Sequence, residues 1–232
     1  MKSLAGLIDF RMKTSIKFIA IVGPTASGKS AFALRLARHL ESDLVNFDSV
    51  QVYRRFNIGC AKPTPEEQQQ VKHHLIYIVD WSEDFDAQKF ATICQDTCTT
   101  LWDQGKIPVL VGGTGLYLRA FMQQQFHGKL PSDKDLRNSL NKKSPSTLFK
   151  LLLRLDEHRA RQLHPNDTYR VIRALEIRIL TGKPFAKHET VTTTQNDNGF
   201  IIYLKPARDA LRERIRARTA AMLGHGLVDE VV

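Results

Sequence analysis

The sequence predicts an α/β protein in which a parallel β-sheet is flanked by helices and interrupted by an inserted all-helical domain. Two observations lead to this prediction. Short apolar stretches alternate with amphipathic helical patterns through the first half of the chain, which is typical of a parallel sheet covered on both faces. From about 126 to 190 the strand signal gives way to helical periodicity. We therefore expect a core at 1–125 and 191–232, with the insertion at 126–190.

Periodicity places the elements of the core. Apolar, β-branched runs predict strands, and apolar residues three or four apart predict helices. The predicted strands are 17–22, 43–48, 74–80, 107–113 and 200–205. The predicted helices are 30–40, 86–106, 113–121 and 211–223.

The insertion is predicted to hold three helices, at 130–140, 146–163 and 166–182, followed by a polar loop at 190–199. Asp167 is expected to cap the last helix and Gly182 to end it. Residues 129–187 hold 14 Lys and Arg against six Asp and Glu, so they supply most of the net charge of +10. Such a surface favours a polyanionic partner, although a solvated basic face is the alternative.

Composition narrows the class of protein. The 232 residues suffice for a real core, and no run reaches the roughly 18 apolar residues of a membrane helix. Residues 1–15 lack the features of a secretory signal, so we expect a poorly ordered leader, with amphipathic targeting as the alternative. Cys60, Cys94 and Cys98 form neither a disulfide framework nor a zinc pattern, and the latter two are expected in the core. These features favour a cytoplasmic protein without a membrane segment. We also expect a monomer.

One motif carries the first chemical signal. GPTASGKS matches G-x-x-x-x-G-K-[ST] at Gly23, Gly28, Lys29 and Ser30, with a predicted strand before it and a helix after it. Backbone N–H groups of such a loop bind phosphate oxygens, Lys29 joins them, and the Ser30 hydroxyl helps to hold Mg²⁺. The sheet is therefore expected to be of the P-loop NTPase type. The motif indicates a polyphosphate, and it specifies neither ATP nor hydrolysis.

Two further stretches lie at the carboxyl ends of predicted strands, where sites form in open α/β sheets. Asp48 ends the second strand and can accept a proton from a nucleophile, although a helix N-cap is the alternative. Gly112 and Gly113 allow a close approach to a ligand, and the Thr114 hydroxyl can reach it. A helix start without a ligand is the alternative there.

These residues belong to a longer series of motifs that resembles one family. GPTASGKS, DSVQVYR, IGCAKP, HHLI, PVLVGGTGLYLRA, HPNDTYRVIRALEI and TGKP occur in the order found in tRNA dimethylallyltransferases, also called tRNA isopentenyltransferases. The resemblance runs from about Phe18 to the end of the chain. It implies that dimethylallyl diphosphate binds in the loop and that its five-carbon group moves to N6 of adenosine 37. The implied tRNAs read UNN codons and carry A36-A37 in the anticodon stem-loop, and the products are N6-dimethylallyladenosine and diphosphate.

The resemblance also implies residue roles. Asp48 is the implied general base, and Thr25 contacts the bridging oxygen of the leaving diphosphate. Mg²⁺ is the implied cofactor, held partly by Ser30. The implied diphosphate site comprises Gly23, Pro24, Thr25, Ala26, Ser27, Gly28, Lys29, Ser30 and, as a candidate whose alternative is a solvated helix face, Arg218. The implied tRNA contacts are Asp48, Ser49, Val50, Gln51, Thr114, Arg137, Tyr169, Arg170, Val171, Ile172 and Arg173.

The chain departs from the family pattern in three places. Cys60 replaces a frequent Thr, and Tyr169, which can stack on a base, replaces the usual Gln. Family members also usually extend beyond the GLVDEVV stretch, so a C-terminally short chain is expected to lack part of the tRNA surface. Two other functions therefore stay open, a P-loop small-molecule kinase and a catalytically inactive RNA-binding member of the family.

Overall fold

The computed structural model describes residues 16–123, 125–127, 130–184, 190–192 and 198–232, and the expected leader at 1–15 lies outside them. The chain divides into two compact units. The core unit comprises Met1–Gln124 and Thr194–Val232, and the helical unit comprises Gln125–Thr193. The predicted bounds of the insertion, 126–190, lie just inside the second range.

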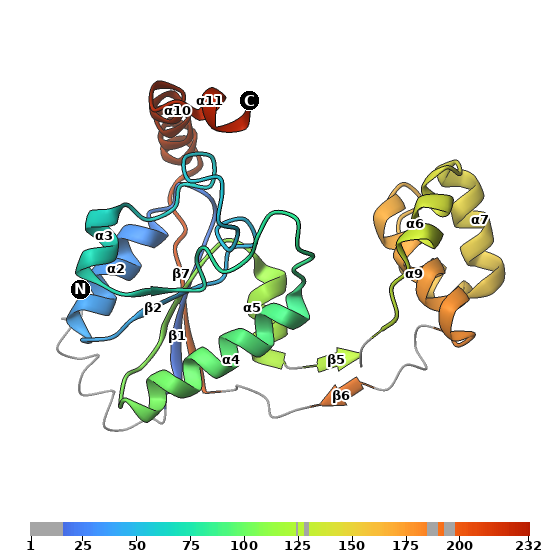
Figure 1. Cartoon of the computed structure of the whole chain (residues 1–232), viewed down its shortest axis with the longest axis horizontal. Helices are drawn as coiled ribbons and strands as arrows, with labels where there is room; N and C mark the ends of the chain where they lie inside the picture. Colours follow the sequence, from blue (N-terminus) through green and yellow to red (C-terminus); the bar gives the residue numbers. More distant parts are fainter. Residues whose placement is uncertain (1–15, 124, 128–129, 185–189, 193–197) are drawn as a thin grey trace. The chain divides into compact units, whose positions relative to one another are not determined.

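A five-stranded parallel sheet forms the centre of the core unit, as predicted (Figure 1). Across the sheet the strands are β3 (His73–His74), β2 (Leu44–Asn46), β4 (Val109–Val111), β1 (Phe18–Val22) and β7 (Gly199–Tyr203). The helices of this unit are α2 (Lys29–His39), α3 (Pro65–Gln70), α4 (Ala87–Asp103), α5 (Gly115–Gln123), α10 (Arg208–Gly224) and α11 (Leu227–Val231).

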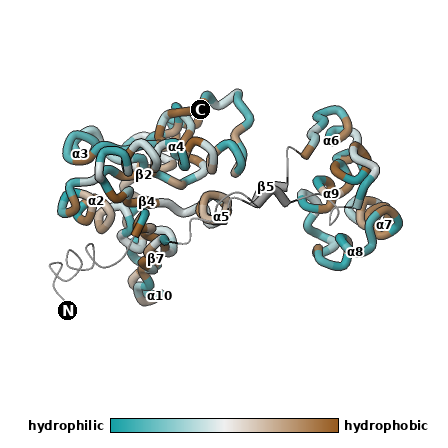
Figure 2. The backbone as a smooth tube through the Cα atoms, turned by 90° about the horizontal axis from the view of Figure 1, so that it is seen from below, coloured by the Kyte–Doolittle hydropathy of each residue, from teal (hydrophilic) through white to brown (hydrophobic). Residues whose placement is uncertain are grey.

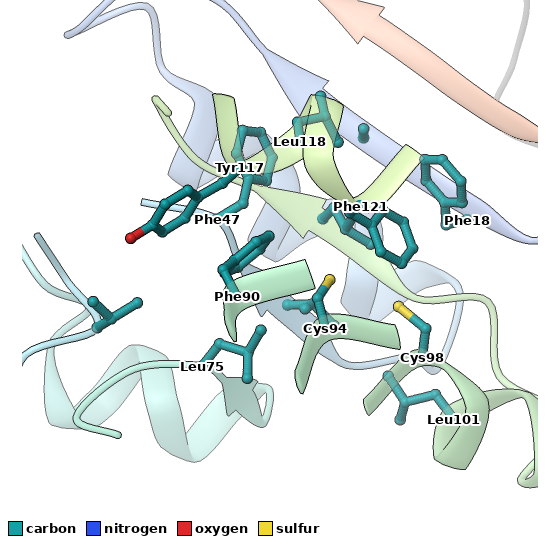
Figure 3. Close-up of a cluster of buried hydrophobic side chains, with 14 of the residues drawn as sticks. Phe18, Phe47, Leu75, Phe90, Cys94, Cys98, Leu101, Tyr117, Leu118 and Phe121 are labelled. Atoms are coloured by element: carbon teal, nitrogen blue, oxygen red, sulfur yellow. The ribbon is translucent and has the colours of Figure 1, made fainter. Parts of the chain in front are cut away.

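The two faces of the sheet have separate hydrophobic cores because successive residues of a strand point to opposite faces. In β1, Phe18 and Ala20 join the core beneath α4 and α5, whereas Ile19 and Ile21 join the core beneath α2. Figure 3 shows the first of these cores, in which aromatic side chains from the strands and from both helices meet. The apolar residues of β2 and β4, and those of β1 up to Ile21, are thus buried, which explains why these strands read as continuous apolar runs. In the edge strand β7, Phe200, Ile201 and Tyr203 are exposed.

Cys94 and Cys98 take the packing role predicted for them. Both are fully buried on one face of α4 and lie in the core of Figure 3. Burial raises the pKa of the Cys94 thiol well above its ordinary value, and its contact with Cys98 adds to the shift. The Cys94 thiol is therefore an inert core group at neutral pH.

The predicted strand at 74–80 was wrong over most of its length. β3 comprises two residues, and Val79 adds an isolated bridge to Tyr53. Leu75 and Tyr77 have φ angles of 60° and 59°, in the left-handed region that no strand residue adopts. Apolar composition predicted a strand here, but the chain turns to bury Leu75 beneath the sheet.

The helical unit has its own core. Its helices are α6 (Lys134–Asn141), α7 (Pro145–Leu155), α8 (Glu157–Ala160) and α9 (Thr168–Thr181). Hydrophobic and hydrophilic stretches alternate along them (Figure 2), and the apolar side chains form one buried cluster. The predicted helix at 146–163 is broken at Asp156, whose carboxylate accepts a hydrogen bond from the Arg159 N–H and caps α8. Asp167 and Gly182 cap α9 as predicted.

A short ribbon also belongs to the helical unit, and the sequence analysis did not predict it. β5 (Gln125–His127) pairs with β6 (Thr190–Thr192) in antiparallel register. Residues 190–192 were expected to be loop, and 193–197 of the same stretch lie outside the described residues. Three-residue strands carry too few residues for a periodic signal.

Asp43, immediately before β2, forms a charge cluster that ties three segments of the core unit together. Its carboxylate accepts hydrogen bonds from Lys106 Nζ at 2.8 Å and His74 Nε2 at 2.9 Å. Burial raises the pKa of Asp43, but the hydrogen bonds from His74 and Lys106 outweigh this effect and hold the pKa below its ordinary value. The ionised carboxylate therefore stabilises the folded chain.

We expect Asp43→Asn to lower the free energy of unfolding by about 1–3 kcal/mol at neutral pH, the range for hydrogen bonds to a charged group. A lowered pKa contributes stability above the pKa of the unfolded chain, and this contribution is lost as pH falls through the folded pKa. The variant should therefore lose less stability than the parent between about pH 5 and pH 2. Denaturant titrations across this range test this, with exposed Asp96→Asn as the control. Equal acid sensitivity in Asp43→Asn and the parent would contradict it.

Candidate active site

The loop at 23–30 connects β1 to α2 in the arrangement expected of a phosphate-binding loop. Gly28 has a φ of 92° and is the N-cap of α2, so the helix begins at Lys29. Gly23 has a φ of 149°, and a Cβ there would lie 2.5 Å from the Leu204 carbonyl oxygen. Glycine is therefore required at position 23, because the chain leaving β7 passes against the loop.

Lys29, the first residue of α2, binds back onto the start of this loop. Its Nζ donates hydrogen bonds to the carbonyl oxygens of Gly23 at 2.8 Å and Pro24 at 2.7 Å. Burial lowers the pKa of Lys29, the negative charge of Asp48 opposes this, and the positive charge of Arg218 lowers the pKa further. The charge of Lys29 therefore interacts with that of Asp48, the predicted base, and with that of Arg218, the candidate residue for binding the diphosphate. An anion bound between the two cations would relieve their repulsion.

A cavity of about 440 Å³ opens beside the loop. It brings together many of the predicted site residues from four separate segments of the core unit. Arg218 is half-buried on α10, whereas its neighbours on this helix are exposed. The predicted residues that line the cavity are Thr25, Ala26, Ser27, Gly28, Lys29, Ser30, Asp48, Gln51, Gly112, Gly113 and Arg218. Residues that line it without a predicted role are Ala31, Asn46, Ala61, Glu67 and Val111.

The Ser27 hydroxyl gives a direct test of whether the loop suits an anion. It is buried, and it has no hydrogen-bond partner among the described residues. A buried hydroxyl without a partner costs free energy, and a phosphate oxygen would supply the acceptor that it lacks. The exposed Ser30 hydroxyl at the start of α2 is a ligand of the kind that Mg²⁺ takes beside a phosphate. The loop therefore fits a diphosphate with its metal ion.

Asp48 is held at the carboxyl edge of the sheet by its own turn. Its Oδ1 accepts a hydrogen bond from the Val50 N–H at 3.0 Å, and no helix begins there, so the N-cap alternative is wrong. A Cβ at Gly112 would lie 2.5 Å from the Phe47 carbonyl carbon, so only glycine lets the chain after β4 pass this turn. A Cβ at Gly113 would lie 3.3 Å from Asp48 Oδ2, so the two glycines leave room for the turn and for its carboxylate.

The side chains of Thr114 and Gln51, both predicted to contact tRNA, form hydrogen bonds with other segments of the protein. The Thr114 hydroxyl accepts a hydrogen bond from the Ser49 N–H at 2.9 Å and donates one to Ser49 Oγ at 3.0 Å. The Gln51 side-chain nitrogen donates to the carbonyl oxygens of Cys60 and Ala61, both at 3.0 Å. Both side chains therefore fix the backbone around the cavity, a role that the sequence analysis did not predict.

In the helical unit, the predicted tRNA contacts fall into two groups. Tyr169 is 80% exposed, and Arg170 is also exposed on α9. Val171 and Ile172 are buried in the helical core, so their side chains pack within the unit. Within this stretch, only Tyr169, Arg170 and the partly buried Arg173 therefore present side chains to solvent.

Arg137 and Arg173 bind a buried carboxylate, Glu176. Arg137 Nε donates to Glu176 Oε1 at 2.9 Å, and Arg173 forms an ion pair with Oε2. Burial raises the pKa of Glu176, but hydrogen bonds from the Asp133 N–H, Arg173 and Arg137 outweigh it and leave the pKa lowered. Loss of either arginine would leave a buried charge partly uncompensated, so both stabilise this unit.

Two features are absent from the described residues, a cluster of metal-binding side chains and a membrane-spanning helix. Among the residues that the structure describes, no group of three or more His, Cys, Asp or Glu side chains is placed to hold a metal ion. Within the same part of the chain, no helix is both long and apolar enough to cross a membrane.

The parallel sheet, the phosphate loop and the carboxylate at the same edge define a P-loop-type α/β protein. Residues 51–232 match the family model described as IPP transferase. A tRNA dimethylallyltransferase of Desulfotalea psychrophila is 42% identical over 219 residues, which cover 92% of this chain and 69% of that protein. The chain belongs to the IPP transferase family.

Solved structures agree with this assignment. A full-length tRNA isopentenylpyrophosphate transferase from Bacillus halodurans is 40% identical, with a TM-score of 0.62, and the match covers 93% of this chain and 69% of that one. A eukaryotic dimethylallyltransferase acting on tRNA is 29% identical, with a TM-score of 0.75, over 92% of this chain and 54% of that one. The fold and the family were thus predicted correctly from the motifs.

Proposed function

We propose that the chain transfers a dimethylallyl group from dimethylallyl diphosphate to N6 of adenosine 37 in tRNAs that read UNN codons. The products are N6-dimethylallyladenosine and diphosphate. The observation that carries this proposal is the single cavity in which the phosphate loop, Asp48 and Arg218 meet. Relatives named as tRNA dimethylallyltransferases support the choice of donor and acceptor.

Each residue of the cavity has its own role in the proposed transfer. The N–H groups of the loop, Lys29 and Arg218 bind the diphosphate and stabilise the charge that develops as the C1–O bond breaks. The Thr25 hydroxyl lies beside the bridging oxygen that departs with the diphosphate. N6 of the flipped adenine forms the new bond to C1, and its proton passes to the Asp48 carboxylate. Mg²⁺, held by Ser30 and the phosphates, would supply further neutralisation of the leaving group.

Transfer of label tests this function. The chain is incubated with dimethylallyl diphosphate labelled in its five-carbon group and with an anticodon stem-loop carrying A36-A37. We expect label in the RNA, release of diphosphate, and no label in a stem-loop with G37. Phosphate transfer from labelled ATP to a small acceptor would instead identify a kinase. Stem-loop binding without transfer would identify a non-catalytic RNA-binding protein.

The helical unit is proposed to bind the tRNA backbone through its basic surface, and Arg170 tests this proposal. Its ion pair with Asp167, at 3.4 Å, is exposed and contributes little stability. We expect Arg170→Ala to weaken stem-loop binding and to make the salt dependence of log affinity shallower by roughly one unit. Its free energy of unfolding should stay within about 0.5 kcal/mol of the parent.

Two control variants separate binding from stability. Arg161→Ala removes an equally exposed arginine of the same unit that lies outside the predicted contacts, so its salt dependence should match the parent. Arg173→Ala should lower the free energy of unfolding by about 1–3 kcal/mol, because Glu176 loses a buried partner. A salt slope in Arg170→Ala equal to that of the parent would exclude Arg170 from the phosphate contacts.

A further inference from the structure

The last described helix, α11, binds a distant stretch of backbone through one carboxylate. Glu230 of α11 accepts hydrogen bonds from three successive backbone N–H groups, those of Asn57, Ile58 and Gly59. The distances are 2.8 Å from Ile58 N to Oε1 and 2.8 Å from Gly59 N to Oε2. These residues belong to the stretch 57–62, here called the 57–62 loop.

Converging N–H groups of this kind form an anion-binding concavity, and the chain fills it with its own carboxylate. Burial raises the pKa of Glu230, but the three N–H groups outweigh it, with help from the charge of Lys62, and the pKa is lowered. A Cβ at Gly59 would lie 3.2 Å from Leu227 Cδ1, so the loop packs tightly against α11. The contact is therefore both charged and close.

Lys62 holds the other end of the 57–62 loop. This side chain is buried, and its Nζ donates hydrogen bonds to the carbonyl oxygens of Tyr53 and Arg55 at 2.5 Å and 2.7 Å. It also donates to Asn57 Oδ1 at 3.2 Å and lies 4.1 Å from the centroid of the Tyr77 ring. Burial lowers the pKa of Lys62. The loop is thus held by one cation and one anion, and both of them bind Asn57.

The middle of the loop forms part of the cavity wall. Cys60 and Ala61 line the cavity, and their carbonyl oxygens accept the hydrogen bonds from the Gln51 side chain. Phe56 and Ala61 have φ angles of 63° and 47°, which cost energy for residues other than glycine. Because the backbone is strained just before the loop, at Phe56, and within it, at Ala61, contacts from outside must hold the loop.

We propose that Glu230 is a positioning residue for the acceptor side of the site. It fixes the 57–62 loop, the loop fixes the Gln51 amide, and Gln51 forms the wall beside Asp48 against which the adenine is placed. This inference rests on the proposed function. Glu230 does not line the cavity, so its effect on the reaction is indirect and should spare diphosphate binding at the phosphate loop.

Hydrogen exchange and kinetics of Glu230→Ala test this role. We expect the Asn57, Ile58 and Gly59 amides to exchange at least about tenfold faster, because each lost bond to a charged acceptor contributes more than a factor of ten. The KM for the stem-loop should rise roughly tenfold, and the KM for dimethylallyl diphosphate should stay within about twofold. Glu230→Gln keeps one acceptor oxygen and should fall between Glu230→Ala and the parent.

Asp229→Ala is the matched control, because it removes the same charge from an exposed neighbour on the same helix. It should leave both the exchange rates and the two KM values unchanged. Faster exchange in Glu230→Ala without a change in the stem-loop KM would overturn the inference. An equal rise in both KM values would also overturn it, since that would reflect a general structural role.

A readout that does not require transfer separates this inference from the proposed function. The Gln51 side-chain amide protons are expected to be protected from exchange in the parent and to lose this protection in Glu230→Ala. If the parent transfers no label to the stem-loop, the proposed function fails while this measurement still stands. Unchanged protection of Gln51 in Glu230→Ala overturns the inference, whatever the activity of the chain.

Discussion

Replacing Asp48 with alanine is expected to lower the rate of dimethylallyl transfer by roughly 10²–10⁴-fold, the usual contribution of a general base. The exocyclic amine of adenine is a weak nucleophile, and its proton needs an acceptor as the new bond forms. Asp48 lies at the edge of the cavity, within electrostatic reach of Lys29. Single-turnover transfer at saturating substrates measures the effect, while affinities for the stem-loop and for dimethylallyl diphosphate should change little.

Asp48→Asn provides the sharper comparison. The carboxylate also accepts the Val50 N–H, so alanine removes a contact within the turn as well as the base. Asparagine keeps an oxygen for Val50 but takes up no proton, so the turn stays intact and the loss of rate reports the proton transfer alone. Transfer by Asp48→Asn at near the parental rate would show that Asp48 is not the base.

The phosphate loop could be predicted from the sequence because its determinants are local. A strand, a glycine turn and a helix follow one another within residues 17–40, and the motif needs no distant partner. Asp48 and the glycine pair were also predictable, since carboxyl ends of parallel strands meet at one edge of the sheet. The structure places Asp48, Gly112 and Gly113 at one cavity with the loop.

Other features depend on contacts between distant segments, which periodicity does not reveal. Glu230 binds backbone N–H groups 171 to 173 residues earlier in the chain, and nothing in its local pattern marks it. Two of the three arginines predicted to contact tRNA, Arg137 and Arg173, bind Glu176, whose buried charge they compensate from two helices. Motif matching identified these positions but not their partners within the chain.

Lys29→Ala is expected to weaken binding of dimethylallyl diphosphate roughly 10- to 100-fold, since hydrogen bonds to charged groups contribute about 1.5–3 kcal/mol. Stem-loop affinity should be almost unchanged. The transfer rate should fall further than the affinity, because negative charge on the diphosphate grows as the C1–O bond breaks. Calorimetry with each ligand measures the affinities, and Arg35→Ala removes an exposed cation from the same helix as the control. A loss confined to the stem-loop would contradict the assignment.

The lowered pKa of Lys29 gives this prediction a pH dependence that a purely structural role would lack. Burial and the charge of Arg218 favour the neutral amine, whereas a bound diphosphate favours the ammonium form. Affinity for the diphosphate should therefore fall as pH rises through the pKa of Lys29 in the free protein, which lies below the ordinary 10.5. Lys29→Ala has no such group, so its weaker affinity should follow a flatter curve across the same alkaline range. Parallel pH curves for the parent and the variant would mean that the charge of Lys29 does not contribute to diphosphate binding. Lys29 would then act only through its two hydrogen bonds to the carbonyl oxygens of Gly23 and Pro24.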